Sequence, residues 1–155
     1  MTGIVRLGNR IAILALLLAC CGCGKSTYRV QGKVTFEGQP LQGGGSISFV
    51  PMGSEPGKTA AGEIGPDGSY QLMTNRPGDG SMPGEFRVVI VQVTVKEPER
   101  SADGTAAAKV TETVAPKDRI PAIYSDHRKS PLITTVQKVS VNEIDFDLKR
   151  QPGTK

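Results

Sequence analysis

The sequence predicts an all-β protein, a seven-stranded antiparallel β-sandwich of Ig-like architecture. Three observations support this fold class. Gly (19) and Pro (11) are plentiful among 155 residues, while apolar residues make up only 37%, which is typical of short strands joined by turns. Several segments alternate apolar and polar residues with the period of two that indicates a strand with one buried face. The domain also lacks the helical period that would predict packed helices.

The first strand is expected at 28–36, where apolar Tyr28, Val30, Val34 and Phe36 alternate with polar residues. Ile47 and Phe49 repeat the pattern after the turn Gly43-Gly-Gly45, and a weaker strand follows at 60–64. Gly65-Pro-Asp-Gly68 predicts a tight turn, because Pro presets φ and Gly accepts a positive φ. The turn would join 60–64 to a strand containing Tyr70 and Leu72 as a hairpin.

A longer strand is expected at 85–95. It has Phe86, Val88 and Ile90 on one face and four valines on the other, which predicts a central strand or a bulge that switches phase. The last pair of strands contains Val139 and Val141, followed after Asn142 by Ile144, Phe146 and Leu148. Between these strands, 96–119 is polar and Ala-rich, so we expect a mobile loop there, with or without a short helical turn.

The N-terminal segment has the pattern of a signal peptide. Arg6 and Arg10 precede the uncharged apolar run 11–19. Nine helical residues span only about 14 Å, less than half of the ~30 Å hydrocarbon core of a bilayer. A transmembrane anchor is therefore not expected, and residues 1–19 are predicted to be a cleaved leader.

The leader ends in Leu17-Leu-Ala-Cys20, which is similar to a lipobox with Leu at −3, Ala at −1 and Cys at +1. The thiol of the +1 Cys takes a diacylglycerol before the leader is cut. Cys20 is therefore the predicted lipidation site, with Cys21 and Cys23 as fallback acceptors, and 20–27 is a lipidated tether. Since all three cysteines lie in this window, the domain is expected to have no internal disulfide.

A phosphate-binding loop is the competing interpretation of Gly24-Lys-Ser-Thr27. That pattern needs a Gly five residues before Gly24, where Ala19 stands. It also needs a strand before it and a helix after it, so that backbone N–H groups face the phosphates. The sequence meets none of these requirements. Nucleic-acid binding is not expected either, because the chain has no basic stripe with interleaved aromatic residues.

The segment 124–128 (Tyr-Ser-Asp-His-Arg) is the richest polar cluster. Ser125, Asp126 and His127 are consecutive, whereas a nucleophile, a base and an orienting group must converge through the fold. We therefore predict that Ile120, Pro121 and Tyr124 hold this loop on the sandwich while 126–129 stay solvated. His127 is the only histidine, so no zinc site is predicted.

Calcium is the other cation considered, since carboxylates occur at Asp67, Asp79, Asp145 and Asp147. No loop carries three oxygen ligands at EF-hand-like spacing. Asp67 and Asp79 stand beside Gly, where Asx-turn hydrogen bonds explain them, and the other two would lie on the wet face of the last strand. We predict no catalytic residue, metal or cofactor.

Several segments together resemble a known family. They are Gly32-Lys-Val-Thr-Phe-Glu-Gly-Gln-Pro-Leu41, Ile47-Ser-Phe-Val-Pro51, Asp67-Gly-Ser-Tyr-Gln-Leu72, Pro77-Gly-Asp-Gly80 with Pro83-Gly84, Ile120-Pro-Ala-Ile-Tyr124 and Phe146-Asp-Leu148. In this order they resemble small planctomycete-type lipoproteins with a carboxypeptidase-regulatory-like, or transthyretin-like, domain. The resemblance implies a prealbumin-like sandwich over 28–149, with a disordered tail at 150–155, a location in the cell envelope and no established chemistry.

The expected function is that of a membrane-anchored envelope lipoprotein. Its domain would be a non-catalytic structural or binding module, facing the periplasm or the exterior. Its exposed loops at 37–45, 75–84 and 96–130 would contact an envelope protein or a glycan. The alternative is an accessory domain that partners a secreted enzyme or a transport complex. A third hypothesis, an enzyme in its own right, predicts that activity is lost on His127→Ala.

Overall fold

The computed structural model describes residues 26–53, 57–96, 111–112 and 114–151. The leader, the three cysteines, residues 97–110 of the expected loop and the last four residues lie outside the described residues, so the predictions made for them stay predictions. No helix in the described ranges is both long and apolar enough to cross a bilayer.

The described chain is all-β apart from two short 3₁₀ helices. The strands are β1 (Arg29–Phe36), β2 (Gln39–Pro40), β3 (Gly45–Pro51), β4 (Ala60–Ile64), β5 (Ser69–Gln71), β6 (Gly84–Gln92), β7 (Val95–Lys96), β8 (Thr111–Glu112), β9 (Ile133–Val136), β10 (Val141–Glu143) and β11 (Phe146–Leu148). The 3₁₀ helices are η2 (Pro116–Asp118) and η3 (Ala122–Ser125).

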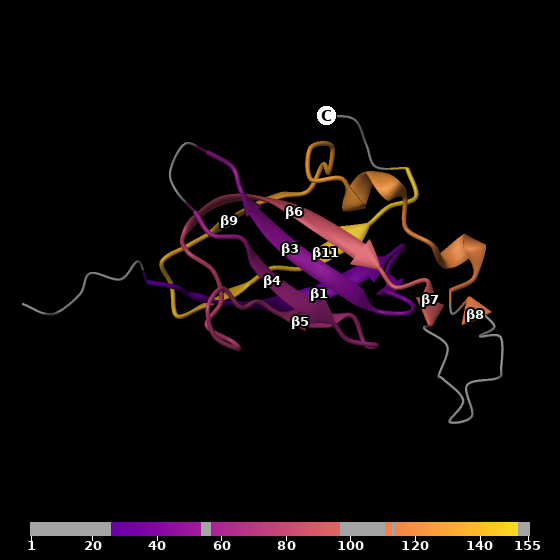
Figure 1. Ribbon diagram of the computed structural model, residues 1–155, viewed down its shortest axis with the longest axis horizontal. Coiled ribbons are helices and arrows are strands. Elements are labelled where there is room, and N and C mark those ends of the chain that lie inside the picture. The colour runs from indigo at the N-terminus through magenta and orange to yellow at the C-terminus, as the bar shows by residue number, and fades with distance from the viewer. Residues whose placement is uncertain (1–25, 54–56, 97–110, 113, 152–155) are drawn as a thin grey trace, which may run out of the picture.

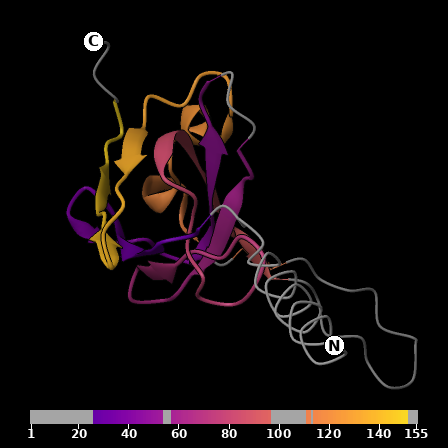
Figure 2. The same cartoon turned by 90° about the vertical axis from the view of Figure 1, so that its left-hand side faces the viewer.

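Most strands belong to one sheet with the order β10-β1-β5-β4-β3-β6-β9 (Figure 1). β2 and β11 also pair with β1, while β7 and β8 form a separate pair. The sheet is mostly antiparallel, as expected, but it has nine strands instead of the expected seven, because it also contains the unpredicted β2 and β9. β10 and β11, however, run parallel to β1, because the chain crosses to the far edge of the sheet after β9. The sheet curls around its core, which makes the fold β-sandwich-like (Figure 2).

The first strand confirms the prediction from alternation. Val30 and Val34 are fully buried in β1 and Phe36 nearly so, while Arg29 and Lys33 are exposed. The turn at 65–68 is also confirmed, with Gly68 at a φ of 79°. It joins β4 to β5, where Ile64 pairs with Tyr70.

The core lies inside the curl and is built mainly from Val, Ile and Leu around a few aromatic rings. Phe49 of β3 is at its centre. Its ring centroid lies 5.9 Å from that of Phe86, 6.1 Å from Phe146 and 6.5 Å from Tyr70. These tilted and edge-on contacts are the geometries that aromatic pairs prefer. One residue thus links β3 to β5, β6 and β11.

Two parts of the strand prediction need correction. The expected strand 85–95 ends at Gln92, although β6 is interior as predicted, because it pairs with both β3 and β9. Val139 and Val141 are 43% and 37% exposed, whereas Asn142 is buried. The Asn142 side chain accepts a hydrogen bond from Gln137 N (2.8 Å) and donates to Gln137 O (3.1 Å). This bridge across the turn before β10 is why the polar residue points inward.

Candidate binding groove

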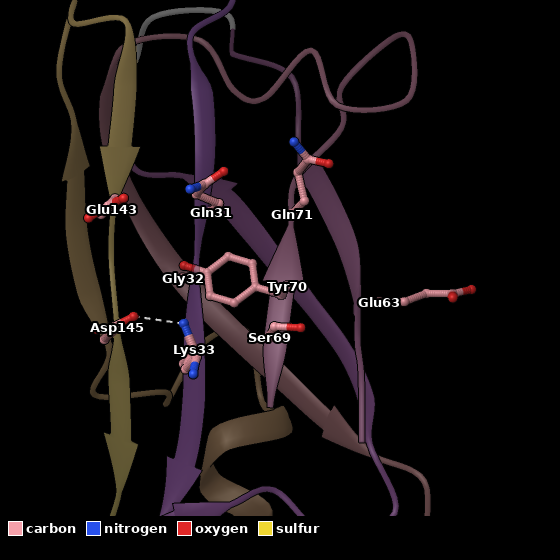
Figure 3. A pocket seen from close by; sticks show the side chains of 9 residues that line it. All are labelled: Gln31, Gly32, Lys33, Glu63, Ser69, Tyr70, Gln71, Glu143 and Asp145. Atoms are coloured by element: carbon pink, nitrogen blue, oxygen red, sulfur yellow. Dashed lines mark hydrogen bonds between the residues drawn. The ribbon is translucent and has the colours of Figure 1, made fainter. Parts of the chain in front are cut away.

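A polar groove of about 640 Å³ lies where β1 and β5 meet the segment from β10 to β11. We call it the outer-face groove. Its lining residues are Gln31, Gly32, Lys33, Glu63, Ser69, Tyr70, Gln71, Glu143 and Asp145 (Figure 3). They come from four strands and from the connection between β10 and β11, so their placement depends on the register of the sheet.

Strand pairing brings the groove side chains together in rows. Gln31 of β1 is opposite Gln71 of β5 and beside Glu143 of β10. One step along β1, Lys33 is opposite Ser69. Residues at alternate positions of a strand point to the same face, so these polar side chains share one side of the sheet.

Tyr70 and Gly32 lie at the centre of the outer-face groove. The Tyr70 ring lies at the middle of the group in Figure 3, and its hydroxyl donates a 2.6 Å hydrogen bond to Ile144 O. Burial raises the pKa of Tyr70, and the charge of Asp145 raises it further, so the side chain is a neutral phenol. Gly32 pairs with Tyr70, and a Cβ on Gly32 would lie only 2.0 Å from Ile144 O. The glycine therefore allows β1 to approach Ile144 closely.

The groove carries more negative than positive charge. Glu63, Glu143 and Asp145 are its carboxylates, and Lys33 is its cation. Asp145 Oδ1 accepts a 2.7 Å hydrogen bond from Lys33 N (dashed in Figure 3). Within the described part of the chain, the side chains of Gln31, Glu63 and Glu143 have no hydrogen-bonding partner. Such amide and carboxylate groups accept and donate hydrogen bonds, so the groove suits a polar ligand with hydroxyl or amine donors.

The polar cluster at 124–128 is organised as a local turn. Tyr124 is buried, as predicted, and its hydroxyl donates to Lys149 O at 3.0 Å. Ser125 Oγ donates to Ala122 O, and Asp126 Oδ1 accepts from Arg128 N. This bond from the Arg128 N–H lowers the pKa of Asp126. His127 is exposed. The described contacts therefore place these polar groups in turn hydrogen bonds and do not arrange them as a catalytic set.

The other candidate carboxylates also have structural partners. Asp67 Oδ1 accepts from Ser69 Oγ (2.6 Å) and Ser69 N (3.0 Å), which lowers its pKa. Asp79 accepts from the backbone N–H groups of 74–76. Its partial desolvation raises the pKa, but these three donors outweigh it, and the net shift is downward. The Asx-turn interpretation is thus confirmed for Asp67, whereas Asp79 binds N–H groups that precede it in the sequence and closes its loop without forming an Asx turn. Across the described ranges, His, Cys, Asp and Glu form no group of three suited to a metal.

Asp145, just before β11, and Asp147 within it are both exposed, as expected, but they also bind β1 and the turn that follows it. Asp147 accepts hydrogen bonds from Gly38 N and Thr35 Oγ1, both at 2.9 Å, and forms an ion pair with Lys149. The hydrogen bond from Lys149 is the largest cause that lowers the pKa of Asp147, to about 2. These carboxylates join the final segment to the first strand.

The predicted contact loops do not form one surface. The loop 37–45 meets the segment around η2, since Gln92 Nε2 donates to both Gln42 O and Asp118 O. The loop 75–84 lies at the other end of the sheet, where Ser81 pairs with Tyr28. The prediction missed the outer-face groove, because its residues lie on strand faces rather than loops. The polar residues at positions 31 and 33 of the first strand were the available signal in the sequence.

Comparison with known proteins gives little functional information. No protein-family model and no curated protein matches the chain. A solved structure of a DUF3823 family protein from Parabacteroides merdae ATCC 43184 is similar, with a TM-score of 0.42 and 14% identity over 81% of this chain and 47% of that one. A 9R-lipoxygenase from Cyanothece PCC8801 has a TM-score of 0.39 and 9% identity over 92% of this chain and 20% of that one. This chain thus spans about half the length of the first protein and a fifth of the second.

Proposed function

We propose that this protein is an envelope lipoprotein whose β-domain is a non-catalytic binding module. The observation that carries the proposal is the sequence Leu17-Leu-Ala-Cys20, which follows a basic and then apolar leader and precedes the folded domain by only a few residues. A short leader with small residues before its cleavage site is typical of an exported protein. In this proposal the domain is a transthyretin-like sandwich of the carboxypeptidase-regulatory-like type, supported by the resemblance above.

The anchor would be the lipid on Cys20. A single acyl chain gives only marginal membrane binding, whereas two or three buried chains hold a protein stably, since each buried CH₂ contributes about 0.8 kcal/mol. The diacylglycerol that a lipobox cysteine receives supplies two chains. The domain would then stay at the membrane surface and face the periplasm or the exterior.

The outer-face groove is the proposed binding surface. It combines a volume in the range of small-ligand pockets with amide and carboxylate side chains at Gln31, Glu63 and Glu143 that no described group binds. The excess of carboxylates favours a ligand rich in hydroxyl or amine donors, such as an envelope glycan or a polar peptide segment.

The anchor is tested by metabolic labelling with an alkyne fatty acid in a bacterial host. Wild-type protein is expected to carry the label and to sediment with membranes. Cys20→Ser should lose both the label and membrane association, whereas the matched controls Cys21→Ser and Cys23→Ser should keep both. An unlabelled wild-type protein found in the soluble fraction would overturn the proposal. Label that disappears only with Cys21→Ser or Cys23→Ser would move the acceptor to that cysteine.

The groove is tested on solubilised native envelope with the full-length protein as bait. We expect the wild-type bait to retain glycan or peptide material. The double variant with Gln31→Ala and Gln71→Ala should retain less of it. The control pair Thr134→Ala and Thr135→Ala lies on β9, at the opposite edge of the sheet from β10, and should retain the wild-type amount. Equal retention by both pairs would exclude the groove as the binding surface. Stoichiometric recovery of one protein, insensitive to the groove variants, would favour the accessory-domain alternative.

A further inference from the structure

One end of the sheet gathers the segments around the start of β1. We call it the tether end, and it comprises residues 26–29, 51–53, 57–60, 73–85 and 136–141. Strand pairing defines it, since Arg29 pairs with Val141, Tyr28 with Ser81, Phe49 with Ala60, Pro51 with Phe86 and Gly84 with Val136. Its loops gather at the left of Figure 1, where the indigo strand β1 begins.

The tether end carries an excess of positive charge. Its cations are Arg29, Lys58, Arg76 and Lys138, all exposed. The carboxylates of its described residues are Asp79 and Glu85. Asp79 is already bound to three backbone N–H groups of its own loop, so its charge is partly satisfied within the protein. The remaining cations point to an anionic partner.

Exposed apolar side chains lie beside these cations. Met73 is 46% exposed, Val139 43% and Val141 37%. Val141 pairs directly with Arg29, and Val139 neighbours Lys138 in the turn before β10. Cationic and apolar groups side by side are the composition of protein surfaces that bind membrane interfaces.

The opposite end of the sheet has no such excess. Its described cations Lys117, Arg119, Lys149 and Arg150 are matched by carboxylates at Glu37, Asp67, Asp118 and Asp147. Several of these groups bind one another or the backbone, as in the ion pair of Lys149 with Asp147. The charge asymmetry is therefore a property of the tether end and does not reflect the composition of the whole domain.

The proposed lipid anchor brings this end to a membrane. Cys20 and Tyr28 are eight residues apart, and extended chain spans at most about 3.6 Å per residue. The start of β1 would therefore stay within about 29 Å of the lipidated cysteine. A cation within a Debye length of about 8 Å from an anionic surface is attracted to it, and this tether lets the domain reach that distance.

We propose that the tether end is a membrane-docking surface that binds anionic lipid headgroups of the membrane holding the anchor. The inference rests on the proposed lipidation of Cys20. Docking at this end would stand the strands upright on the membrane. The outer-face groove, on the side of the sheet between its two ends, would remain open to ligands.

The test uses the processed, lipidated full chain in vesicles and measures amine acetylation by mass spectrometry. In vesicles of phosphatidylglycerol and phosphatidylcholine, Lys58 and Lys138 are expected to react several-fold more slowly than in phosphatidylcholine alone. Lys117 at the opposite end and Lys33 in the groove should react equally in both. High salt should restore the reactivity of Lys58 and Lys138, because it screens exposed charges.

A charge-reversal pair makes the test specific. Arg76→Glu with Lys138→Glu should abolish the protection of Lys58, whereas the control Lys117→Glu with Lys129→Glu should leave it unchanged. Protein that does not float with the vesicles would refute the lipid anchor. Protein that floats, but shows equal reactivity at all lysines in both lipid mixtures, would refute docking while leaving the anchor intact.

Discussion

Gly32 lies where β1 passes close to the chain between β10 and β11. A Cβ there would lie 2.0 Å from Ile144 O and 2.7 Å from Ile144 C, and backbone atoms cannot turn aside as a flexible side chain can. Gly32→Ala is therefore expected to lower the free energy of unfolding by about 1–3 kcal/mol, the usual cost of overpacking. Urea denaturation followed by circular dichroism measures this change.

The matched control for this substitution is Gln31→Ala. Gln31 is the preceding residue, its side chain faces the groove, and no described group binds it. The control should change the free energy of unfolding by less than about 0.5 kcal/mol, as surface substitutions usually do. If Gly32→Ala were as mild as the control, the close approach of β1 to Ile144 would be wrong.

Asp147 gives the fold an acid-sensitive contact. Hydrogen bonds from Lys149, Gly38 N and Thr35 lower its pKa from 3.8 to about 2. Because the pKa is lower in the folded state, its stabilising contribution is fully present above the unfolded value and is lost as the pH falls from about 3.8 to about 2. The stability of Asp147→Asn should therefore depend less on pH in this window than that of the wild type. Part of the pH dependence will remain, because the pKa values of Asp67, Asp79 and Asp126 are also lowered in the folded protein.

Denaturation midpoints of wild type and Asp147→Asn at pH 6, 4 and 2.5 measure this effect. The difference between the two proteins should be largest at pH 6 and should shrink towards pH 2.5. A difference that stays constant over this range would mean that the Asp147 carboxylate does not make these bonds in its charged form.

At the scale of elements, two hydrogen bonds of one side chain join η3 to the segment after β11. The Tyr124 hydroxyl donates to Lys149 O at 3.0 Å and accepts from Lys149 N at 2.9 Å. Tyr124→Phe keeps the buried ring but removes both bonds, so we expect a loss of about 2 kcal/mol, since each bond contributes roughly 1 kcal/mol net. Thermal denaturation measures it, with Tyr28→Phe as control, because no described group binds the Tyr28 hydroxyl. Equal effects of the two variants would argue against the bridge to Lys149.

The same scale shows which elements were predictable from sequence. The strand β1 was predicted because its apolar and polar residues alternate strictly. This pattern can be recognised without knowing which strands pair with β1. β9 was missed, although Ile133-Thr-Thr-Val136 is rich in β-branched residues, because a half-exposed strand of four residues has almost no period to detect. β10 was assigned the wrong buried face, since an inward Asn is explained only by its bonds to Gln137. Local sequence patterns thus predict strands that bury one face. They fail where a tertiary hydrogen bond determines which side chain points into the core.

The groove could not be predicted for a related reason. Its residues are ordinary polar positions on strands, and each alone is typical of a solvated face. They form a group only through register, which places Gln31 between Gln71 and Glu143. Register across strands that are distant in sequence depends on the whole sheet, and the parallel crossover to β10 has no local signature in the sequence. The lipidation site, in contrast, can be predicted from sequence, because a leader and the cysteine that follows it are recognised by their order along the chain.

At the scale of the whole molecule, a single core should make the domain unfold as one unit. The buried cluster contains residues from nearly every strand of the main sheet and Tyr124 of η3, and Phe49 contacts rings on three other strands. Small domains with one contiguous core usually unfold in a single cooperative transition. The chain has no Trp and three Tyr, so tyrosine signals report on tertiary structure while far-ultraviolet circular dichroism reports on the strands.

Phe49→Ala tests this cooperativity most directly. Phe49 is fully buried, and replacing a buried Phe by Ala costs about 3–5 kcal/mol through lost burial and the cavity left behind. Both the tyrosine and the far-ultraviolet midpoints should shift to lower urea by the same amount. Val91→Ala on β6 is the control, because its side chain is 48% exposed, and it should move neither midpoint appreciably. If the tyrosine transition separated from the far-ultraviolet one in Phe49→Ala, the sheet would consist of at least two independently stable parts, and η3 with Tyr124 would be the first region to examine by hydrogen exchange.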